Sequence, residues 1–318
     1  MTRKDILHRM NRRVICLDSH SHSGGIDLYN YQHTRLHTTQ NMRDLALKMQ
    51  LAGIDYFVVY PMASSTYFDS ITFLPTRIDD FPYELSNKSL IYESGLFGTN
   101  ASIFPAVHPT EKVREQIRFL EDELSKDTIS GLKFHPLATH TTVNDLFRSD
   151  IARLLKEYNL PITVHSSDFD EYSDPKLIFR WIEKNPEIVV NVAHCGFFDK
   201  EFYKGVGNFE KLYIDTSSFS VLCKLFENRH VGGHIKLKWE DPSEALLELF
   251  HIVPDRLMWG TDEPWTCYTD YNGNLIVDGD IFKEKRLLDS LPKEVKEKIS
   301  YYNPLYFLQG HKKNENKS

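Results

Sequence analysis

The chain has 318 residues, and its 38 Lys and Arg against 45 Asp and Glu give a formal net charge of −7. This acidic balance disfavours nucleic acid as a partner, because proteins that bind a phosphate backbone are usually basic. Apolar residues form 41% of the sequence, which excludes disorder along the whole chain, and no apolar run approaches the ~18 residues of a membrane span.

Eight short apolar runs, rich in β-branched residues, recur at 14–20, 54–60, 102–108, 129–135, 161–165, 188–194, 212–216 and 256–262. Nearly continuous apolar runs of this length are typical of parallel strands that are covered on both faces. Amphipathic stretches between the runs predict helices at 39–51, 110–124, 143–158, 174–184 and 242–252. This alternation predicts an α/β fold, a (β/α)8 TIM barrel, with a doubly wound open sheet as the alternative.

Two stretches exceed a minimal barrel and predict insertions after strands 2 and 7. Residues 61–100 are rich in aromatic residues but show no obvious long helix. Long loops of this kind are usually functional or disordered, and the aromatic content argues against disorder. We expect a lid over the site or, equally, a surface that packs against another subunit in a homodimer. Residues 223–241 form the second insertion, and the whole of 1–318 is expected to be one domain.

The cysteines and the opening segment bear on the compartment. The four cysteines are scattered and form no CxxC pair, which indicates reduced thiols. The apolar stretch from Val14 to Leu17 stops at Asp18 and is too short for the core of a signal peptide. These features predict a cytoplasmic protein.

The first predicted strand ends in two histidines with one residue between them. Alternate side chains on a strand share a face, so His20 and His22 can point together into the barrel mouth and chelate one metal ion. Asp18 shares their parity one pleat deeper, where we expect its carboxylate to hydrogen-bond a ligand imidazole. Such a histidine pair is weak evidence alone, because solvated loop histidines are the commoner explanation.

Other predicted strands add candidate ligands at the same end of the barrel. His165 ends the fifth strand, His194 the sixth and Asp262 the eighth. Barrel enzymes place their catalytic groups at these carboxyl ends. Histidines and an aspartate that converge from separate strands predict a site for a divalent metal, most simply zinc, with iron or manganese as alternatives.

The fourth strand carries Lys133 and His135 on one face. A lysine that points into a barrel mouth is costly unless it meets an anion. Lys133 could therefore bind a substrate carboxylate, or be carbamoylated and bridge two metal ions, and an ion pair with Asp18 or Asp215 is the purely structural alternative. We predict that Lys133 and His135 bind substrate, and that His108, at the end of the third strand, is a weaker candidate for the wall of the site.

Together these pieces resemble the amidohydrolase superfamily, and within it the amidohydrolase-related branch. The matching segments are ICLDSHSH, GLKFHP, PITVH, VVNVAHCG, LYIDTSS, LMWGTDEP and the closing YYNPLYFLQ. The resemblance spans roughly 14–309 and implies a distorted barrel with a metal at its carboxyl-terminal mouth. By motif, the ligands would be His20, His22, His165 and Asp262.

The resemblance leaves the role of His194 open. It would be a ligand to a second metal or, in one-metal members, an acid, a base or an electrophile. One ion is typical of this branch, and Lys133 at the position that some members carbamoylate keeps a two-metal site open.

The residue set suits hydrolysis of an amide, ester or lactone bond by a metal-activated water. Asp262 would accept the proton of the water, and His194 would polarise a carbonyl or protonate the leaving atom. A non-oxidative decarboxylase of an aromatic or unsaturated acid is the first alternative, and a metal-binding protein without catalysis is the second. A nuclease of the TatD type is disfavoured, since those enzymes are expected to carry glutamate where this chain has Lys133.

The substrate is expected to be a small anionic molecule, with neither nucleic acid nor a membrane as partner. Further residues are candidates for lining its pocket: Tyr29, Tyr31, His33, Arg35, Arg77 and Trp265.

Overall fold

The computed structural model describes residues 15–24, 40–62, 80–227, 229, 232–269 and 274–310. Short parallel strands alternate with helices throughout these ranges. The strands are β1 (Leu17–Ser23), β2 (Tyr56–Pro61), β3 (Ala101–Ile103), β4 (Ala106–Val107), β5 (Leu132–Phe134), β6 (Ile162–Val164), β7 (Val190–Val192), β8 (Leu212–Asp215) and β9 (Leu257–Met258). All neighbouring pairs run parallel, in one sheet of order β1-β2-β3 and one of order β4-β5-β6-β7-β8-β9.

The first gap between the two sheets lies inside the predicted third strand. Phe104 and Pro105 separate β3 from β4, and Pro105 has no N–H to continue the ladder. The Ser130 N–H donates to the carbonyl of Ile103 at 2.9 Å, and the Lys133 N–H donates to that of Pro105 at 2.8 Å. The strand that begins at Leu132 is therefore joined to both halves of the third strand.

The second gap lies between β9 and β1. The Ser19 N–H donates to the Trp259 carbonyl at 2.9 Å, and the Asp262 N–H donates to the His20 carbonyl at 2.7 Å. Hydrogen bonds thus link both edges of the two sheets, and the ring is the predicted (β/α)8 barrel. It is distorted at the two places where regular pairing lapses.

Close packing at the second gap explains Gly260. A Cβ at this position would lie 2.8 Å from the Cβ of His20 and 3.0 Å from the Oγ of Ser19. Real Cβ atoms do not approach so closely, so any side chain here would push β1 away.

We expect Gly260→Ala to lower the free energy of unfolding by about 1–3 kcal/mol, as overpacked sites do. Urea denaturation measures this loss. Gly207→Ala is the matched control, because nothing lies within 4 Å of a Cβ there. Equal losses in the two variants would show that close packing at the second gap, between β9 and β1, is not the reason for Gly260.

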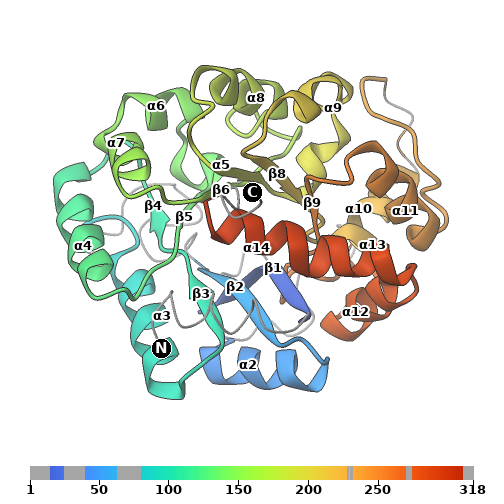
Figure 1. Cartoon of the computed structure of the whole chain (residues 1–318), viewed down its shortest axis with the longest axis horizontal. Coiled ribbons are helices and arrows are strands. Elements are labelled where there is room, and N and C mark those ends of the chain that lie inside the picture. Colours follow the sequence, from blue (N-terminus) through green and yellow to red (C-terminus); the bar gives the residue numbers. More distant parts are fainter. Residues whose placement is uncertain are drawn as a thin grey trace, which may run out of the picture.

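Helices surround the ring of strands (Figure 1). Along the chain these are α2 (Met42–Leu51), α3 (Glu84–Phe97), α4 (Val113–Ser125), α6 (Val143–Arg148), α7 (Asp150–Glu157), α8 (Pro175–Lys184), α9 (Lys200–Gly205), α10 (Phe219–Glu227), α11 (Pro242–Ile252), α12 (Ile281–Asp289) and α13 (Lys293–Glu297). Further elements are α5 (Pro136–Thr139), η2 (His194–Phe198), η3 (Val206–Asn208), η4 (Lys298–Tyr302), α14 (Asn303–Leu308) and the antiparallel pair β10 (Tyr268–Thr269) and β11 (Leu275–Val277).

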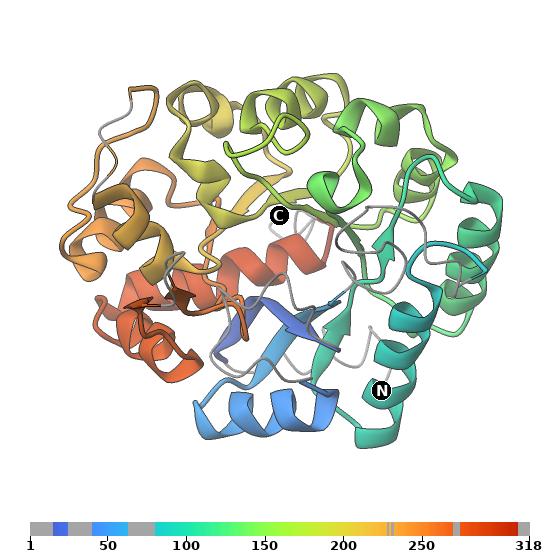
Figure 2. The ribbon, with the colours of Figure 1, turned by 180° about the vertical axis from the view of Figure 1, so that it is seen from behind.

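The apolar core has two parts. The larger part fills the space between strands and helices, and the smaller part fills one end of the barrel. Leu17 and Tyr56, which begin β1 and β2, pack there with Leu305 and Phe307 of α14. Figures 1 and 2 show α14 crossing that end of the ring. The strands begin at this plugged end, so the site must be sought at their carboxyl ends.

One predicted feature of the first insertion is wrong. The stretch 61–100 contains a long helix, α3, where no obvious helix was expected. Its start lacks a capping side chain, since Tyr83 precedes it in the left-handed conformation, and Leu85 and Tyr92 are exposed although they are apolar. Without a cap or an apolar stripe limited to one face, the usual sequence signals of a helix are absent.

The other predicted helices are present; 242–252 has the predicted limits as α11, and the limits of the others differ from those predicted. The stretch 143–158 is two helices, because Ser149 has extended backbone and caps α7 by accepting from the Ile151 N–H at 3.3 Å. Residues 63–79, and with them Arg77, lie outside the described residues, as do Tyr29, Tyr31, His33 and Arg35. In the part of the chain that is described, no helix combines the length and the apolar character needed to cross a membrane.

Candidate metal centre

Three side chains meet at the carboxyl ends of β1 and β9. The Nε2 atoms of His20 and His22 are 3.2 Å apart, and each lies 3.3 Å from Oδ1 of Asp262. His20 is fully buried and Asp262 is 4% exposed. Oδ1 of Asp262 has no hydrogen-bond partner among the described residues, so a buried carboxylate oxygen faces two imidazole nitrogens with nothing to satisfy it.

This triangle fits a divalent metal. Ligand atoms at ~2.0–2.2 Å from a tetrahedral ion lie about 3.3–3.5 Å from one another. The three edges of 3.2, 3.3 and 3.3 Å match that spacing. Imidazole nitrogen and carboxylate oxygen are donors that zinc, manganese and iron accept. The residues present therefore fit the group that the sequence predicts.

Protonation states also suit a metal. Burial, together with the nearby charge of Lys133, lowers the pKa of His20 to about 4. For Asp262, burial alone would raise the pKa, but the surrounding imidazoles of His20, His22 and His194 hold the pKa below its ordinary value. Neutral imidazole and ionised carboxylate are the forms that bind a cation.

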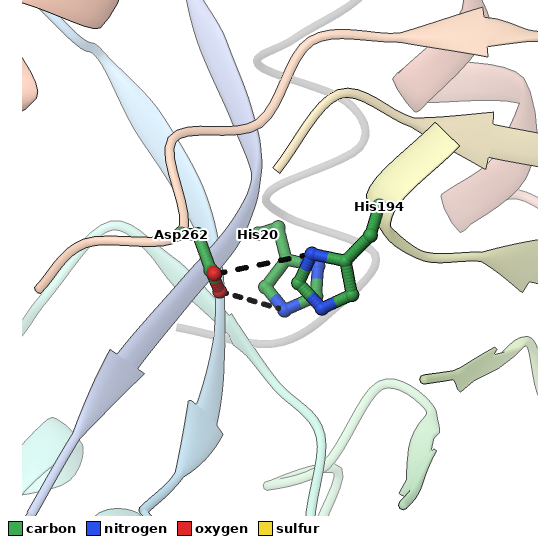
Figure 3. Close-up of side chains that lie close together, drawn as sticks. All are labelled: His20, His194 and Asp262. Atoms are coloured by element: carbon green, nitrogen blue, oxygen red, sulfur yellow. Dashed lines mark ion pairs between the residues drawn. The ribbon is translucent and has the colours of Figure 1, made fainter. Parts of the chain in front are cut away.

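His194 joins this group from the end of β7. His194, His20 and Asp262 each offer one ligand atom, and these three atoms all lie within 4.8 Å of one another. Figure 3 shows the three side chains pointing toward one another, with Nδ1 of His194 3.9 Å from Oδ2 of Asp262. His194 begins η2, where every residue to Phe198 has a positive φ of 49–57°. Such a run is costly at its four residues other than Gly196, so packing around it must hold it in place.

The second insertion packs on that left-handed run. The Ile235 N–H donates to the Phe198 carbonyl at 2.9 Å, and the Lys200 N–H donates to that of Gly233 at 2.8 Å. The rings of Phe198 and Trp239 lie 4.6 Å apart. Residues 232–239 therefore brace the segment that carries His194.

His165 and His135 lie on the far side of His194. Nδ1 of His165 is 3.0 Å from Nε2 of His194, and the rings of His135 and His165 stack at 3.8 Å. The ring of His135 also caps α5, since its Nδ1 accepts from the Ala138 N–H at 3.3 Å. The predicted histidines are thus close together, but His165 reaches the triangle through His194 rather than directly.

Lys133 is buried beneath His20. Its Nζ is 3.3 Å from Nε2 of His20 and 4.5 Å from the centre of the Tyr60 ring. It forms an ion pair with no described carboxylate, so the structural alternative of a pair with Asp18 or Asp215 is not seen. Burial lowers the pKa of Lys133 to about 8, against the opposing charges of Asp215 and Asp262.

The expectation for Asp18 is wrong. The pairing of β1 with β2 shifts register between Asp18 and Ser21, so the strict alternation that placed Asp18 beneath the histidines breaks there. Its carboxylate instead accepts from the N–H and hydroxyl of Thr261, at 3.0 and 2.6 Å, and from the His20 N–H at 2.9 Å. Asp18 ties β1 to the segment after β9.

Asp215 performs the role that Asp18 was expected to have. Its Oδ2 accepts from Nδ1 of His20 at 2.8 Å and from the Asn191 amide at 2.6 Å, and the carboxylate is fully buried. Ser217 and Ser218, which follow it, also contact the site. The segment LYIDTSS was visible in the sequence, but nothing in its spacing showed which residue each of these side chains would reach.

Two weaker candidates take different places. His108 is buried at the start of the segment that leads to α4, where its backbone exchanges two 2.9 Å hydrogen bonds with the Gln116 side chain. The Trp265 ring lies edge-on to His22, 6.4 Å between centroids, and so borders the site.

A buried carboxylic acid lies behind the site, on α12. Glu284 is fully buried, and its Oε1 accepts from the Ser220 N–H at 3.2 Å, while its Oε2 has no partner among the described residues. Burial raises the pKa of Glu284 to about 7. The folded protein therefore keeps a proton that the unfolded chain releases between about pH 4.5 and 7, and stability falls as the pH rises through this window.

Glu284→Gln should remove this dependence. As the pH rises from 5 to 8, the free energy of unfolding of the wild type should fall by roughly 1–3 kcal/mol relative to that of the variant. Urea denaturation at several pH values measures the difference. Glu183→Gln on the outer face of α8 is the control and should leave the pH slope unchanged. Parallel curves for Glu284→Gln and the wild type would contradict the assignment.

Comparison with known proteins identifies the family. The model of a family described as amidohydrolase matches residues 100–309, well over half of the chain. The chain belongs to this amidohydrolase family, as its strand-end motifs predicted. No curated protein matches the sequence.

Solved structures resemble the chain over almost its whole length. A probable 2-pyrone-4,6-dicarboxylic acid hydrolase from Acinetobacter baumannii, with citric acid bound, is 16% identical with a TM-score of 0.58, over 92% of this chain and 99% of that one. The 5-carboxyvanillate decarboxylase from Sphingomonas paucimobilis is 12% identical with a TM-score of 0.61, over 93% and 99%.

A third resembling structure contains a metal. The 5-carboxyvanillate decarboxylase from Novosphingobium aromaticivorans, complexed with manganese and 4-hydroxy-3-methoxy-5-nitrobenzoic acid, is 13% identical with a TM-score of 0.62, over 93% of this chain and 96% of that one. At these identities the likeness establishes the barrel fold. Hydrolases and decarboxylases both occur on it.

Proposed function

We propose that the chain is a divalent-metal-dependent hydrolase that adds water to an amide, ester or lactone bond of a small substrate with a carboxylate. The observation that carries the proposal is the triangle of His20, His22 and Asp262, whose ligand atoms are 3.2–3.3 Å apart with one carboxylate oxygen unsatisfied. A bound ion would supply Lewis acidity there, which brings a water molecule within range of deprotonation near neutral pH and stabilises a developing oxyanion.

Asp262 has the geometry of a proton acceptor. Its Oδ1 faces the two histidines, while its Oδ2 lies 3.9 Å from Nδ1 of His194. Because its pKa is held low, the carboxylate is ionised and can accept a proton from the attacking water. It can then return that proton to the leaving atom.

We assign His194 to the leaving-group side of the scissile bond. It lies on η2, apart from the pair on β1, and its Nε2 is 3.0 Å from Nδ1 of another imidazole, that of His165. In its protonated form His194 can polarise a carbonyl or protonate the departing atom. As a neutral imidazole it is the fourth donor in reach of an ion, and with His165 it is the candidate set for a second one.

Lys133 gives the site its preference for an anion. A buried ammonium without a direct carboxylate partner gains most from a substrate carboxylate, which would offset its desolvation. Its pKa of about 8 leaves it mostly protonated at pH 7. We therefore assign Lys133 to substrate binding. His135 and Trp265 are assigned to the border of the same site.

The experiment that tests this proposal separates hydrolysis from decarboxylation. Zinc- and manganese-loaded protein is incubated with lactones, amides, esters and aromatic carboxylates in water labelled with ¹⁸O and, separately, in ²H₂O. Hydrolysis places ¹⁸O in the product acid, whereas decarboxylation releases CO₂ and places deuterium on carbon. Metal-free protein is the control. Release of CO₂ would show that the protein is a lyase and not a hydrolase. Absence of turnover with every substrate would favour a metal-binding protein without catalysis.

A further inference from the structure

The carboxyl end of β8 contacts three residues of the site at once. Asp215, Ser217 and Ser218 follow one another within four positions, and each makes a hydrogen bond to a side chain from a different strand end. We propose that this segment positions the site: Asp215 orients His20, Ser217 fixes the tautomer of His194, and Ser218 orients the carboxylate of Asp262. The inference deepens the proposed function and rests on it only where turnover is measured.

Asp215 determines which nitrogen of His20 is free. A carboxylate without a proton can only accept, so the 2.8 Å contact requires His20 to carry hydrogen on Nδ1. Nε2 then presents its lone pair toward His22 and Asp262. The Asn191 amide holds the same carboxylate oxygen at 2.6 Å, which fixes the direction of this contact.

Ser217 determines the tautomer of His194 by a count of hydrogens. Its hydroxyl has one hydrogen, and the 2.5 Å contact with Oδ1 of Asp215, an acceptor, uses it. Oγ can then only accept from Nδ1 of His194, 3.0 Å away, and the Ser217 carbonyl at 3.3 Å can only accept as well. Nδ1 of His194 therefore carries hydrogen, and its Nε2 has the free lone pair.

Ser218 holds one oxygen of Asp262 so that the other is free. Its Oγ is 2.6 Å from Oδ2 of Asp262 and 2.7 Å from the Trp265 carbonyl, both of them acceptors. The single hydroxyl hydrogen lies between these two acceptors and is shared by them, and Oδ1 of Asp262 is left facing His20 and His22. Ser218 and Asp262 both have left-handed backbone, with φ of 57° and 64°, so each is held in a conformation that brings the two side chains together.

The position of β8 in the sheet makes this possible. It lies between β7, which leads to His194, and β9, which leads to Asp262. A single strand end thus reaches both neighbours, and Asp215 reaches His20 on β1. The segment is buried, with Asp215 and Ser217 fully enclosed and Ser218 7% exposed.

The test uses Ser217→Ala and Ser218→Ala, with Ser217→Thr as the conservative variant. The matched control is Ser102→Ala, a buried serine on β3 whose Oγ contacts the Tyr56 hydroxyl at 3.0 Å, away from the site. Circular dichroism and thermal unfolding select folded variants. Two readouts need no substrate: histidine tautomers from ¹⁵N NMR of the metal-free protein, and the zinc dissociation constant from competition with a chelator.

We expect Ser217→Ala to lower the population of the Nδ1–H tautomer of His194, because only the longer 3.3 Å contact with the backbone carbonyl of residue 217 remains, and Ser217→Thr to keep it. Ser218→Ala should weaken zinc binding roughly 10–100-fold, as loss of a residue behind a ligand does, and Ser102→Ala should bind zinc as the wild type does. On any substrate that is turned over, Ser217→Ala should lower kcat with KM nearly unchanged.

Three results would overturn the inference: an unchanged His194 tautomer in Ser217→Ala, wild-type zinc affinity in Ser218→Ala, or an equal loss of affinity in Ser102→Ala. These outcomes are independent of the reaction. If the His194 tautomer and the zinc affinity change but no substrate is turned over, the positioning role is supported and the hydrolase proposal is refuted.

Discussion

Asp262→Asn is expected to keep its metal and lose about 10²–10⁴-fold in kcat. The amide still offers an oxygen where Oδ1 faces His20 and His22, and its nitrogen can lie against the hydroxyl of Ser218, which also contacts the Trp265 carbonyl. What the amide cannot do is accept a proton from water. The measurements are elemental analysis of the purified variant and turnover of the substrate found by the isotope experiment.

The control for this substitution is Asp255→Asn, at an exposed aspartate paired with Lys298 at 2.7 Å. It should leave both kcat and metal content unchanged. Near wild-type turnover by Asp262→Asn would remove Asp262 from proton transfer. Loss of the metal as well would show that its charge is needed for binding, and the loss of turnover could then not be assigned to the proton.

His20→Ala combined with His22→Ala is expected to abolish stoichiometric metal binding. Two of the three atoms of the triangle disappear together, and Asp262 with His194 alone offers too few donors to hold a divalent ion in competition with a chelator. Metal content is measured after dialysis against a weak chelator. Circular dichroism checks that the double variant and its control are both folded.

His251→Ala, at an exposed histidine of α11, is the matched control and should retain the metal of the wild type. Unchanged metal content in the double variant would refute the ligand assignment and move the centre to His194 and His165.

Most of the barrel could be predicted because its strands are buried on both faces. β2, β6 and β7 contain only buried residues, and their sequences are the apolar runs from which strands were expected. The carboxyl ends of those runs therefore located His165 and His194 as well. α3 could not be predicted, because Tyr83, which precedes its first residue Glu84, provides no capping side chain, and because the helix carries apolar residues on its exposed face.

The limits at the site have a similar physical reason. His20 and His22 could be predicted because two histidines with one residue between them form a pattern within one strand. They converge with Asp262 because hydrogen bonds join β1 to the segment after β9. Asp18 was misplaced because a one-residue register shift is invisible in composition yet reverses which face a side chain occupies. Asp215 acts from another strand, and only the closed ring shows which strand ends are neighbours.

The measurement that tests the central claim most directly is anomalous X-ray scattering from a crystal of the zinc-loaded protein, recorded on both sides of the zinc edge. We expect one strong peak at bonding distance from Nε2 of His20, Nε2 of His22 and Oδ1 of Asp262. The electron density from the same crystal shows whether Lys133 carries a carbamate, and a second anomalous peak beside it would mark a two-metal site. A map without a peak among these three atoms, in crystals that contain stoichiometric zinc, would contradict the account.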